Sequence, residues 1–532
     1  MTKGGYYAAL WRGEQSQYTD AARERGNIFF EDRFSELTTS RFGGANNTRL
    51  VATNKEWSFV YAVPKEIKDS DEIVTQLVPL LFKEESAQAT SSQREFNVQN
   101  AKDELRERIQ NRQDPYEPLA HRIDSEIVQK IKALNLEGIY IGEEKLRYYP
   151  EKSLASHTLG FVGYEGERRA GQYGVEGFYD EALYGDDLFL SLDYNIQFML
   201  EKKLQNAKDQ FDADGASGVV VNPKTGEIIA LASADSFDPN MYSEVKNIDV
   251  FLNGITQKMF EPGSIFKPFT MAAALDTGAV SPATQYEDVG LVVVGDHTIR
   301  NAGEKTYGVQ SMTNVLELSL NTGAVFAEKK LGHEKFREYA QRFGFGERTG
   351  VDLQGEVAGD MKNVFQKFRD VNFATASFGQ GIAVSPIQLT SAFSAFANGG
   401  QIMKPHVVKE IGNRRVAPEI IGTPISPKTA GQITSMLVSV VENGHAKRAK
   451  VKGYKIAGKT GTAQVVQEGR KGYSDKTIHS FIGFAPAYNP RFVALVKLDN
   501  PKGVNFAESS AAPLFSEIAE YILHYYEIPP SD

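Results

Sequence analysis

The sequence contains no cysteine in its 532 residues. Disulfide frameworks, thiolate catalysis and zinc sites built from thiolates are therefore excluded. The eight histidines are scattered and form no H-E-x-x-H pattern, so we expect no metal site. No cofactor is expected either. No run of about 18 apolar residues occurs, and the first residues show no signal-peptide pattern, so no segment of this sequence is expected to span a membrane.

Basic residues are fewer than acidic ones: 59 Lys and Arg stand against 68 Asp and Glu, which gives a formal net charge of -9 at pH 7. A nucleic-acid-binding protein usually carries a basic stripe, so nucleic acid is not expected as a partner. The hydrophobic content of 41% and the charged content of 24% are typical of a globular protein. A chain of 532 residues is too long for one ordinary core and predicts two to four domains.

The first part of the chain mixes extended and helical patterns. Residues 25–29 and 57–62 read as strands, whereas residues 66–135 show apolar residues at a spacing of three to four, which predicts helices. Within that region, residues 86–111 are strongly polar and predict a solvated helix or, in their first half, a mobile segment. Residues 66–120 are therefore expected to form a polar excursion, and residues 139–190 return to short strands and glycine turns.

A domain boundary is predicted near residues 185–187, which separates an N-terminal domain (1–187) from a C-terminal domain (188–532). The C-terminal domain begins with a helix and a hairpin whose two strands flank residues 222–226. Helical patterning dominates from 264 to 445, and strands near 454–466, 480–486 and 492–498 precede a helix over 513–526. Strands early and late with helices between them predict an α+β fold with an antiparallel sheet.

The chain is organised around residues 261–268, E-P-G-S-I-F-K-P, in which a serine and a lysine stand three residues apart. An apolar run over 269–275 predicts a helix that begins near Ser264. Positions i and i+3 share one face of a helix, so the amine of Lys267 can reach the hydroxyl of Ser264. The free N–H groups at the helix start favour negative charge there. The pattern indicates an activated serine nucleophile, although alone it also fits an ordinary helix cap with a surface lysine.

Two further motifs follow in the chain. Residues 319–321, S-L-N, lie where one helical pattern ends, and a hydroxyl and an amide there can relay a proton and hold a peptide group. Residues 459–462, K-T-G-T, lie in the third-from-last predicted strand and suit a carboxylate-bearing substrate that lies along the strand. Each motif alone is common on protein surfaces. In this order, S-x-x-K, S-x-N and K-T-G are the signature of penicillin-binding proteins and class A β-lactamases.

A competing interpretation concerns residues 453–460, which satisfy the phosphate-loop pattern G-x-x-x-x-G-K-[ST]. A phosphate loop must follow a buried strand and open a helix, so that helix N–H groups can hold the phosphate. Here the preceding residues 445–452 are polar and basic, and residues 461–466 are strand-like. The sequence context therefore argues against a nucleotide-binding site.

Over nearly its whole length the chain resembles the class B penicillin-binding proteins. Leu320 departs from the S-D-N form of the second motif, but the side chains that the family uses, Ser319 and Asn321, are present. The division-type branch is the most similar, given residues 377–381 and the absence of an extra C-terminal repeat module. The further segments that resemble family motifs are residues 25–28 (R-G-N-I), 147–150 (R-Y-Y-P), 174–177 (G-V-E-G), 238–240 (D-P-N), 343–346 (F-G-F-G), 377–381 (S-F-G-Q-G) and 484–487 (F-A-P-A).

The resemblance implies a serine β-lactamase-like transpeptidase domain, with a five-stranded antiparallel sheet flanked by helices, behind an elongated α+β pedestal. It implies a peptidoglycan D,D-transpeptidase that works through a serine acyl-enzyme and is inhibited by β-lactams. Ser264 would be the nucleophile and Lys267 the base, with Ser319, Asn321 and Lys459 completing the catalytic set. The residues expected to bind substrate are Thr460, Gly461 and Thr462, and those expected to form the oxyanion hole through their backbone N–H groups are Ser264 and Thr462.

The resemblance also implies partners and a location. Stem peptides of peptidoglycan would be donor and acceptor, and the N-terminal domain would bind a membrane glycosyltransferase and other division or elongation proteins. The expected location is the extracytoplasmic face of the bacterial cytoplasmic membrane, through an N-terminal transmembrane helix that is missing from this chain. A septal role is expected; the alternatives are an elongation-type enzyme or a scaffold of minor activity. A β-lactamase or a β-lactam sensor fits the long N-terminal region less well.

Overall fold

The computed structural model describes residues 24–34, 47–82, 91–166, 168–366, 369–467 and 472–530. Contacts divide the chain into two compact units, one of Met1–Arg25 with Ala52–Tyr148 and one of Gly26–Val51 with Tyr149–Asp532. This division differs from the predicted boundary at 187/188, because residues 26–51 and 149–187 make their contacts within the larger unit. As a boundary between domains, 187/188 stays a prediction.

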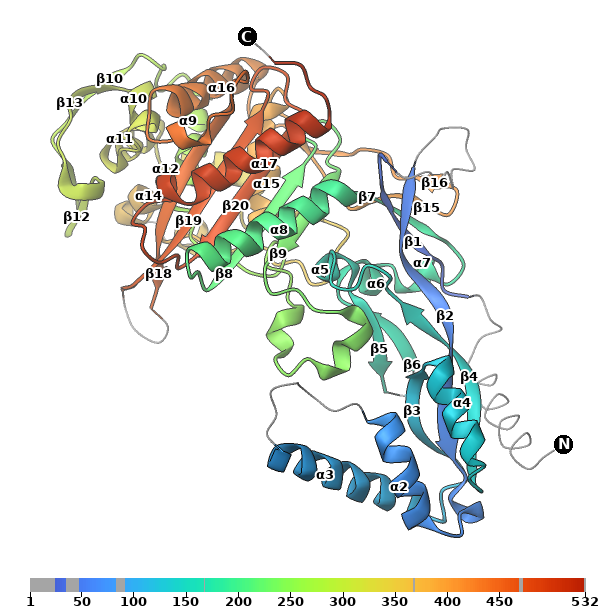
Figure 1. Ribbon diagram of the computed structural model, residues 1–532. Helices are drawn as coiled ribbons and strands as arrows, with labels where there is room; N and C mark the ends of the chain where they lie inside the picture. Colours follow the sequence, from blue (N-terminus) through green and yellow to red (C-terminus); the bar gives the residue numbers. More distant parts are fainter. Residues whose placement is uncertain are drawn as a thin grey trace. The chain divides into compact units, whose positions relative to one another are not determined.

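The smaller unit is a three-stranded antiparallel sheet with three helices (Figure 1). Strand β2 pairs with both of the other strands, and Val74, Leu77, Leu105 and Ile109 are among the buried residues of its core. Asp69 caps the first helix by accepting hydrogen bonds from two backbone N–H groups. The elements are β2 (Thr48–Ala62), α2 (Ser70–Leu81), α3 (Ser91–Gln110), β3 (Glu117–Ile123), α4 (Ser125–Leu134) and β4 (Ile139–Tyr148).

Two expectations for this region change. The helical pattern predicted over 66–135 is interrupted by β3, which pairs antiparallel with β2. The polar stretch 86–111 is a helix from Ser91 onward, and residues 86–90 lie outside the described residues. The excursion expected over 66–120 is therefore largely a helix pair, α2 and α3, whose apolar side chains pack into the core of the unit.

The larger unit is built on a five-stranded antiparallel sheet in the order β18-β19-β20-β8-β9. The predicted hairpin around residues 222–226 is confirmed as β8 and β9, and the three predicted C-terminal strands are confirmed as the other three members. Strand β18 lies at the edge of this sheet. The strands are β8 (Gly215–Val221), β9 (Ile228–Ser233), β18 (Ala457–Val466), β19 (Tyr473–Ala485) and β20 (Phe492–Asp499).

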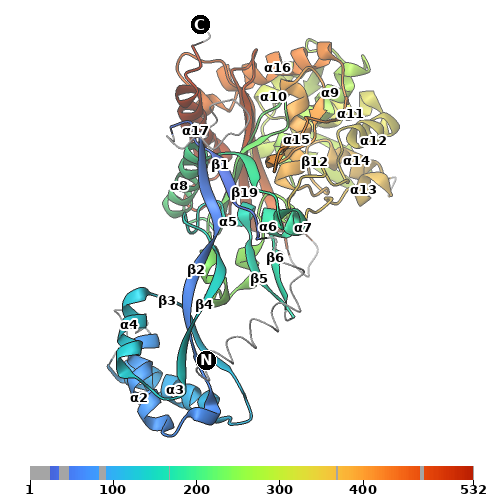
Figure 2. The same ribbon diagram turned by 90° about the vertical axis from the view of Figure 1, so that its right-hand side faces the viewer.

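Helices cover both faces of this sheet. The turned view in Figure 2 separates α8 and α17, on one side of β19, from the group α9 to α16 on the other side. Ser385 and Ser426 cap α15 and α16 and are each followed by a proline at the first helical position, which favours a helix start there. The helices are α8 (Tyr194–Gln210), α9 (Lys267–Asp276), α10 (Met312–Glu317), α11 (Asn321–Leu331), α12 (His333–Arg342), α13 (Lys362–Phe365), α14 (Asp370–Ala376), α15 (Pro386–Ala397), α16 (Pro427–Glu442) and α17 (Ala511–Tyr525).

The helical patterning predicted from 264 to 445 is only partly right, because short strands interrupt it. Two small two-stranded sheets, β10 with β13 and β11 with β12, precede α10, and β14 to β17 lie between α15 and α16. Four-residue strands carry too few apolar positions to show a period in the sequence. These strands are β10 (Gln285–Asp288), β11 (Leu291–Val294), β12 (His297–Arg300), β13 (Gly308–Ser311), β14 (Ile402–Met403), β15 (Val408–Ile411), β16 (Arg414–Arg415) and β17 (Ile420–Gly422).

The first strand of the larger unit, β1, pairs with β7, the strand that directly precedes α8. Strand β1 runs parallel to β7, and β7 pairs in turn with β15. A Cβ at Gly26 would lie 2.0 Å from the carbonyl oxygen of Asp186, so only glycine allows this approach. The remaining elements are β1 (Ile28–Glu31), α5 (Ser156–Leu159), β5 (Phe161–Glu165), β6 (Arg168–Gln172), α6 (Gly174–Phe178), α7 (Asp180–Leu183) and β7 (Leu188–Asp193).

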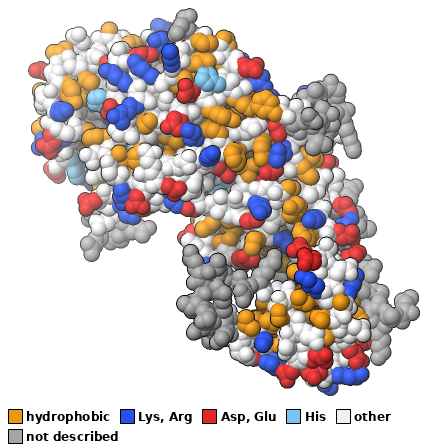
Figure 3. Space-filling model, viewed as in Figure 1, with side chains coloured by type: hydrophobic (Ala, Val, Ile, Leu, Met, Phe, Trp, Pro, Cys, Tyr) orange, Lys and Arg blue, Asp and Glu red, His pale blue; other side chains and the backbone are white. Residues whose placement is uncertain are grey.

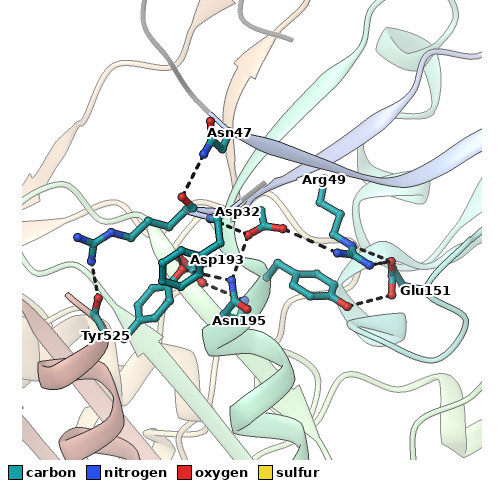
Figure 4. A network of polar contacts seen from close by, with 10 residues as sticks. Asp32, Asn47, Arg49, Glu151, Asp193, Asn195 and Tyr525 are labelled. Atoms are coloured by element: carbon teal, nitrogen blue, oxygen red, sulfur yellow. Dashed lines mark hydrogen bonds and ion pairs between the residues drawn. The ribbon is translucent and has the colours of Figure 1, made fainter. Parts of the chain in front are cut away.

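A polar network connects the chain directly after β1 to helices α8 and α17 (Figure 4). Asp193 caps α8 and accepts a hydrogen bond from the hydroxyl of Tyr525 at the end of α17 (2.9 Å). The side chain of Asn195 donates to both Tyr525 (3.3 Å) and Asp32 (3.2 Å), and Arg49 lies 3.9 Å from Asp32. Burial raises the pKa of Asp193. The network joins β1, the start of β2, α8 and α17 by directional contacts.

The surface shows no stripe of one charge on the face drawn in Figure 3, where Lys and Arg are interspersed with Asp and Glu over the described residues. Among the described residues, no helix is long and apolar enough to cross a membrane.

Candidate active site

The predicted nucleophile, Ser264, lies in a tight turn that leads into a helix. Residues Gly263–Phe266 form a single 3-10 turn, and α9 continues from Lys267 with Pro268 in its first turn, where a missing N–H is tolerated. Gly263 has φ +57° and donates its N–H to the carbonyl of Gly379 (3.0 Å). The loop 377–381 therefore holds the turn that carries Ser264.

The amine of Lys267 lies between two serines. Its Nζ is 3.0 Å from Oγ of Ser264, 3.1 Å from Oγ of Ser319 and 2.5 Å from the carbonyl oxygen of Ser319. A carbonyl oxygen can only accept, so it takes one N–H of the amine. A neutral amine then still has a lone pair, which can accept the hydroxyl proton of Ser264.

Ser319 adopts a backbone conformation that is unusual for a residue with a side chain. Its φ is +57°, in the left-handed region, and Leu320 donates its N–H back to the carbonyl of Val315 (2.9 Å). Such a conformation costs of order 1–2 kcal/mol for a non-glycine residue and persists where surrounding contacts hold it. Here it presents both the carbonyl and the hydroxyl of Ser319 to Lys267.

A second lysine contacts the same hydroxyl from the edge strand. Nζ of Lys459 donates to Oγ of Ser319 (3.0 Å) and to the carbonyl of Thr460 (3.1 Å). Both lysines are buried, with 1% and 0% of their surface exposed for Lys267 and Lys459, respectively. In the described part of the chain, neither forms a salt bridge with a carboxylate, so burial disfavours their charged forms.

Burial therefore depresses both amine pKa values. Burial lowers the pKa of Lys459 to about 7. Burial also places the pKa of Lys267 well below its usual range, and the nearby charge of Lys459 lowers it further. The two amines share the Ser319 hydroxyl as a hydrogen-bond partner, and the charge of Lys459 acts on Lys267. The site thus holds a neutral amine beside a serine hydroxyl at a pH where a solvated lysine is fully protonated.

The lowered pKa of Lys267 and its dependence on the charge of Lys459 predict how acylation depends on pH. Below the apparent pKa of Lys267 the base is protonated, so the acylation rate is expected to fall as pH decreases. Removing the charge of its neighbour in Lys459→Met raises the pKa of Lys267, so the acid limb should move to higher pH. Acylation by a fluorescent penicillin, measured from pH 5 to 10 in both proteins, checks this. A limb at the same or a lower pH in the variant would contradict the coupling.

The motif K-T-G-T lies on the edge strand β18, which packs against the turn that carries Ser264. A Cβ at Gly461 would lie 2.6 Å from Oγ of Ser480 and 3.1 Å from the carbonyl oxygen of Pro262, so glycine keeps the strand close to the nucleophile turn. Lys459 lies within a strand, and no helix follows it, so residues 453–460 do not form a phosphate loop. An edge strand of this kind can pair with an extended peptide.

The structure brings the predicted residues together to different degrees. The side chains of Ser264, Lys267, Ser319 and Lys459 form one hydrogen-bonded cluster. Asn321 begins α11, and its amide donates to the carbonyl of Arg300 (2.9 Å); among described residues it makes no hydrogen bond to the cluster. Thr460 and Thr462 lie on β18, and the hydroxyl of Thr462 accepts a hydrogen bond from a backbone N–H.

One neighbour of the site was not singled out from the sequence. The carboxylate of Glu261 accepts hydrogen bonds from the N–H of Gly381 (3.1 Å) and from the hydroxyl of Tyr473 (3.0 Å). It therefore links the start of β19 and the loop 377–381 to the chain just before Ser264. Burial raises the pKa of Glu261. The position of Glu261 three residues before Ser264 could have indicated that it lies near the site, whereas nothing in the sequence pointed to Tyr473.

No group of three or more metal-binding side chains that could hold an ion occurs in the described ranges. The hydrogen-bonded cluster consists of two lysines and two serines, and in the described chain no carboxylate or imidazole is hydrogen-bonded to them. This arrangement suits acyl transfer through a serine ester.

Two family models match the chain. One described as the penicillin binding protein transpeptidase domain covers residues 216–520, and one described as the penicillin-binding protein dimerisation domain covers residues 44–196. The first includes every residue of the hydrogen-bonded cluster.

Similar proteins carry related names. Stage V sporulation protein D of Bacillus subtilis is 34% identical over 92% of this chain and 78% of its own length. Penicillin-binding protein PbpB of Mycolicibacterium smegmatis is 31% identical over 82% of this chain and 73% of its own length. The crystal structure of penicillin binding protein 3 from Mycobacterium tuberculosis with aztreonam matches at a TM-score of 0.67 and 31% identity, over 73% of this chain and 92% of that one.

Proposed function

Because this chain belongs to the class B penicillin-binding proteins, with a dimerisation domain followed by a transpeptidase domain, we propose that it is a peptidoglycan D,D-transpeptidase that works through Ser264. The observation that carries the assignment of the nucleophile is the 3.0 Å contact between Ser264 and the fully buried amine of Lys267. A buried amine without a carboxylate partner is the base that an unactivated hydroxyl requires.

In the first step, Oγ of Ser264 attacks the carbonyl between the two terminal D-alanines of a stem peptide. Its proton passes to the neutral amine of Lys267. The hydroxyl of Ser319, which lies 3.1 Å from Lys267 and 3.0 Å from Lys459, carries a proton toward the leaving D-alanine amine. The ester that forms on Ser264 is then attacked by an amine of a second stem peptide, which yields the cross-link and frees the serine.

The substrate is held along the edge strand. The hydroxyls of Thr460 and Thr462 bind the terminal carboxylate, and Gly461 lets the peptide lie against β18. The backbone N–H groups of Ser264 and Thr462 stabilise the oxyanion, a contribution of about 10²–10³ in rate per donor. Asn321 binds the peptide of the donor from the start of α11. A β-lactam mimics the donor and remains as an ester on Ser264.

Acylation by a penicillin tests the proposal directly. After labelling with a fluorescent penicillin and digestion, we expect the label on the peptide that contains Ser264. Ser264→Ala should lose all labelling because no other nucleophile occupies the turn, whereas Ser281→Ala, which changes an exposed serine of the same domain, should label normally. Undiminished labelling of Ser264→Ala, or a label on another residue, would refute the assignment.

The family also supports the setting of the reaction. Its members are enzymes of the cell envelope, and we place this chain on the extracytoplasmic side of the bacterial cytoplasmic membrane, where stem peptides are cross-linked. Septal wall synthesis is the proposed duty. The N-terminal region is proposed to bind a membrane glycosyltransferase that supplies the glycan strands.

A further inference from the structure

The hydroxyl of Thr462 has a partner that the mechanism above does not use. Its Oγ1 accepts a hydrogen bond from the backbone N–H of Ala507 at 3.0 Å. Ala507 begins a short 3-10 turn, Ala507–Ser509, in the segment that joins β20 to α17. A backbone group 45 residues away in the sequence thus points at a side chain of the edge strand.

The segment that carries this N–H is firmly held. Ala507 and Ser510 are both 0% exposed, and Ser510 donates its N–H to the carbonyl of Ala507 (3.3 Å). Oγ of Ser510 lies 2.8 Å from Nδ1 of His479, the residue opposite Thr462 on strand β19. Burial lowers the pKa of His479 to about 4, so the ring is neutral near pH 7. Its contact with Ser510 therefore does not change with pH in that range.

The contact determines where the hydroxyl proton of Thr462 points. A threonine hydroxyl has one O–H donor and two acceptor lone pairs, whereas a backbone N–H can only donate. The N–H of Ala507 therefore occupies a lone pair, and the O–H must point away from it. Because donors and acceptors in a chain polarise one another, accepting this bond also makes the hydroxyl a better donor.

We propose that the backbone N–H of Ala507 is a positioning group that orients the Thr462 hydroxyl as a donor to the terminal carboxylate of the donor peptide. The proposal rests on the proposed function, which places that carboxylate at Thr460 and Thr462. Without the N–H, the hydroxyl could present a lone pair to the carboxylate, which would repel it. The segment between β20 and α17 thereby contributes to the selection of donors with a free C-terminus.

Ala507→Pro removes this one N–H at a position where the fold accepts proline. Residue 507 is the first of a helical turn, where proline is favoured, and Phe506 before it is extended (φ -139°, ψ 147°), as a residue before proline should be. The ring carbon also takes the place of the hydrogen and pushes the Thr462 hydroxyl away. Ala507→Gly, which keeps the N–H, is the matched control.

Two thioester donors that differ only at the C-terminus, a free carboxylate and its methyl ester, provide the measurement. Ser264 forms an ester with the acyl group, the thiol leaves, and its release reports the rate. We expect the ratio of kcat/KM for the carboxylate donor to kcat/KM for the ester donor to fall about tenfold in Ala507→Pro. The fall should come mainly through KM, because the charge-assisted hydrogen bond from the Thr462 hydroxyl to the carboxylate is lost. Ala507→Gly should retain the preference.

A purely structural effect of the proline lowers kcat/KM for both donors by the same factor, and an unchanged ratio would overturn the proposal. If the proline variant does not fold, Thr462→Val tests the same contact. It should lower the ratio and speed the hydrogen exchange of the Ala507 amide; unchanged exchange would overturn the proposal. A wild-type protein that labels at Ser264 but does not prefer the carboxylate would instead refute the role proposed for Thr462.

Discussion

Lys267→Met is expected to lower the rate of acylation by a fluorescent penicillin at least about a thousandfold at pH 8. The amine is the group placed to accept the Ser264 proton, and a positioned base contributes typically 10²–10⁴ in rate. Methionine has a similar length and needs no solvation, so it removes the cost of burying an amine. It leaves the Ser319 carbonyl without the donor that lies 2.5 Å away, which costs about 1–3 kcal/mol.

The two effects on stability oppose each other, so the thermal midpoint should change by only a few degrees while acylation is lost. Lys428→Met is the matched control, because it makes the same change at an exposed position of α16. It should acylate at the normal rate. If Lys267→Met acylated within tenfold of the unchanged protein, another group would have to be the base.

Gly379→Ala is expected to damage both the stability of the larger unit and its acylation. Gly379 has φ +82°, and a Cβ there would lie 2.2 Å from the carbonyl oxygen and 2.6 Å from the nitrogen of Gly263. Real atoms cannot approach so closely, so the loop or the nucleophile turn must move, and the 3.0 Å hydrogen bond between these glycines is lost. We expect a destabilisation of about 3–5 kcal/mol and at least a tenfold slower acylation.

Gly278→Ala separates the steric contact from the backbone conformation. Gly278 has a similar φ of +74°, but no atom lies within 4 Å of a Cβ placed there. It should cost only the 1–2 kcal/mol of the left-handed conformation and leave acylation unchanged. Thermal unfolding and penicillin labelling of both variants make the comparison. Equal effects of the two substitutions would show that the contact with Gly263 is not tight.

Local pattern alone was enough for much of the fold. The helix α8, the hairpin of β8 and β9, and the three C-terminal strands follow from apolar spacing and turn residues, which act over a few positions. The short strands β10 to β13 and strand β3 were not found, because so few residues carry too little periodicity to compete with the helical pattern around them. The division into two compact units depends on contacts between distant parts of the chain, such as the pairing of β1 with β7, which local patterns do not show.

The same division applies to the site. The sequence by itself determined that Ser264 and Lys267 meet, because they are three residues apart and local helix geometry brings the amine within reach of the hydroxyl. Only the tertiary structure decided their chemistry. Burial and the arrival of Lys459 from a strand nearly two hundred residues away lower the amine pKa values, and the Ala507 N–H orients a hydroxyl. A pKa depends on solvent exclusion and on charges that are near in space, which the sequence does not show. A backbone N–H is present in almost every residue, so the sequence cannot indicate which one will orient a side chain.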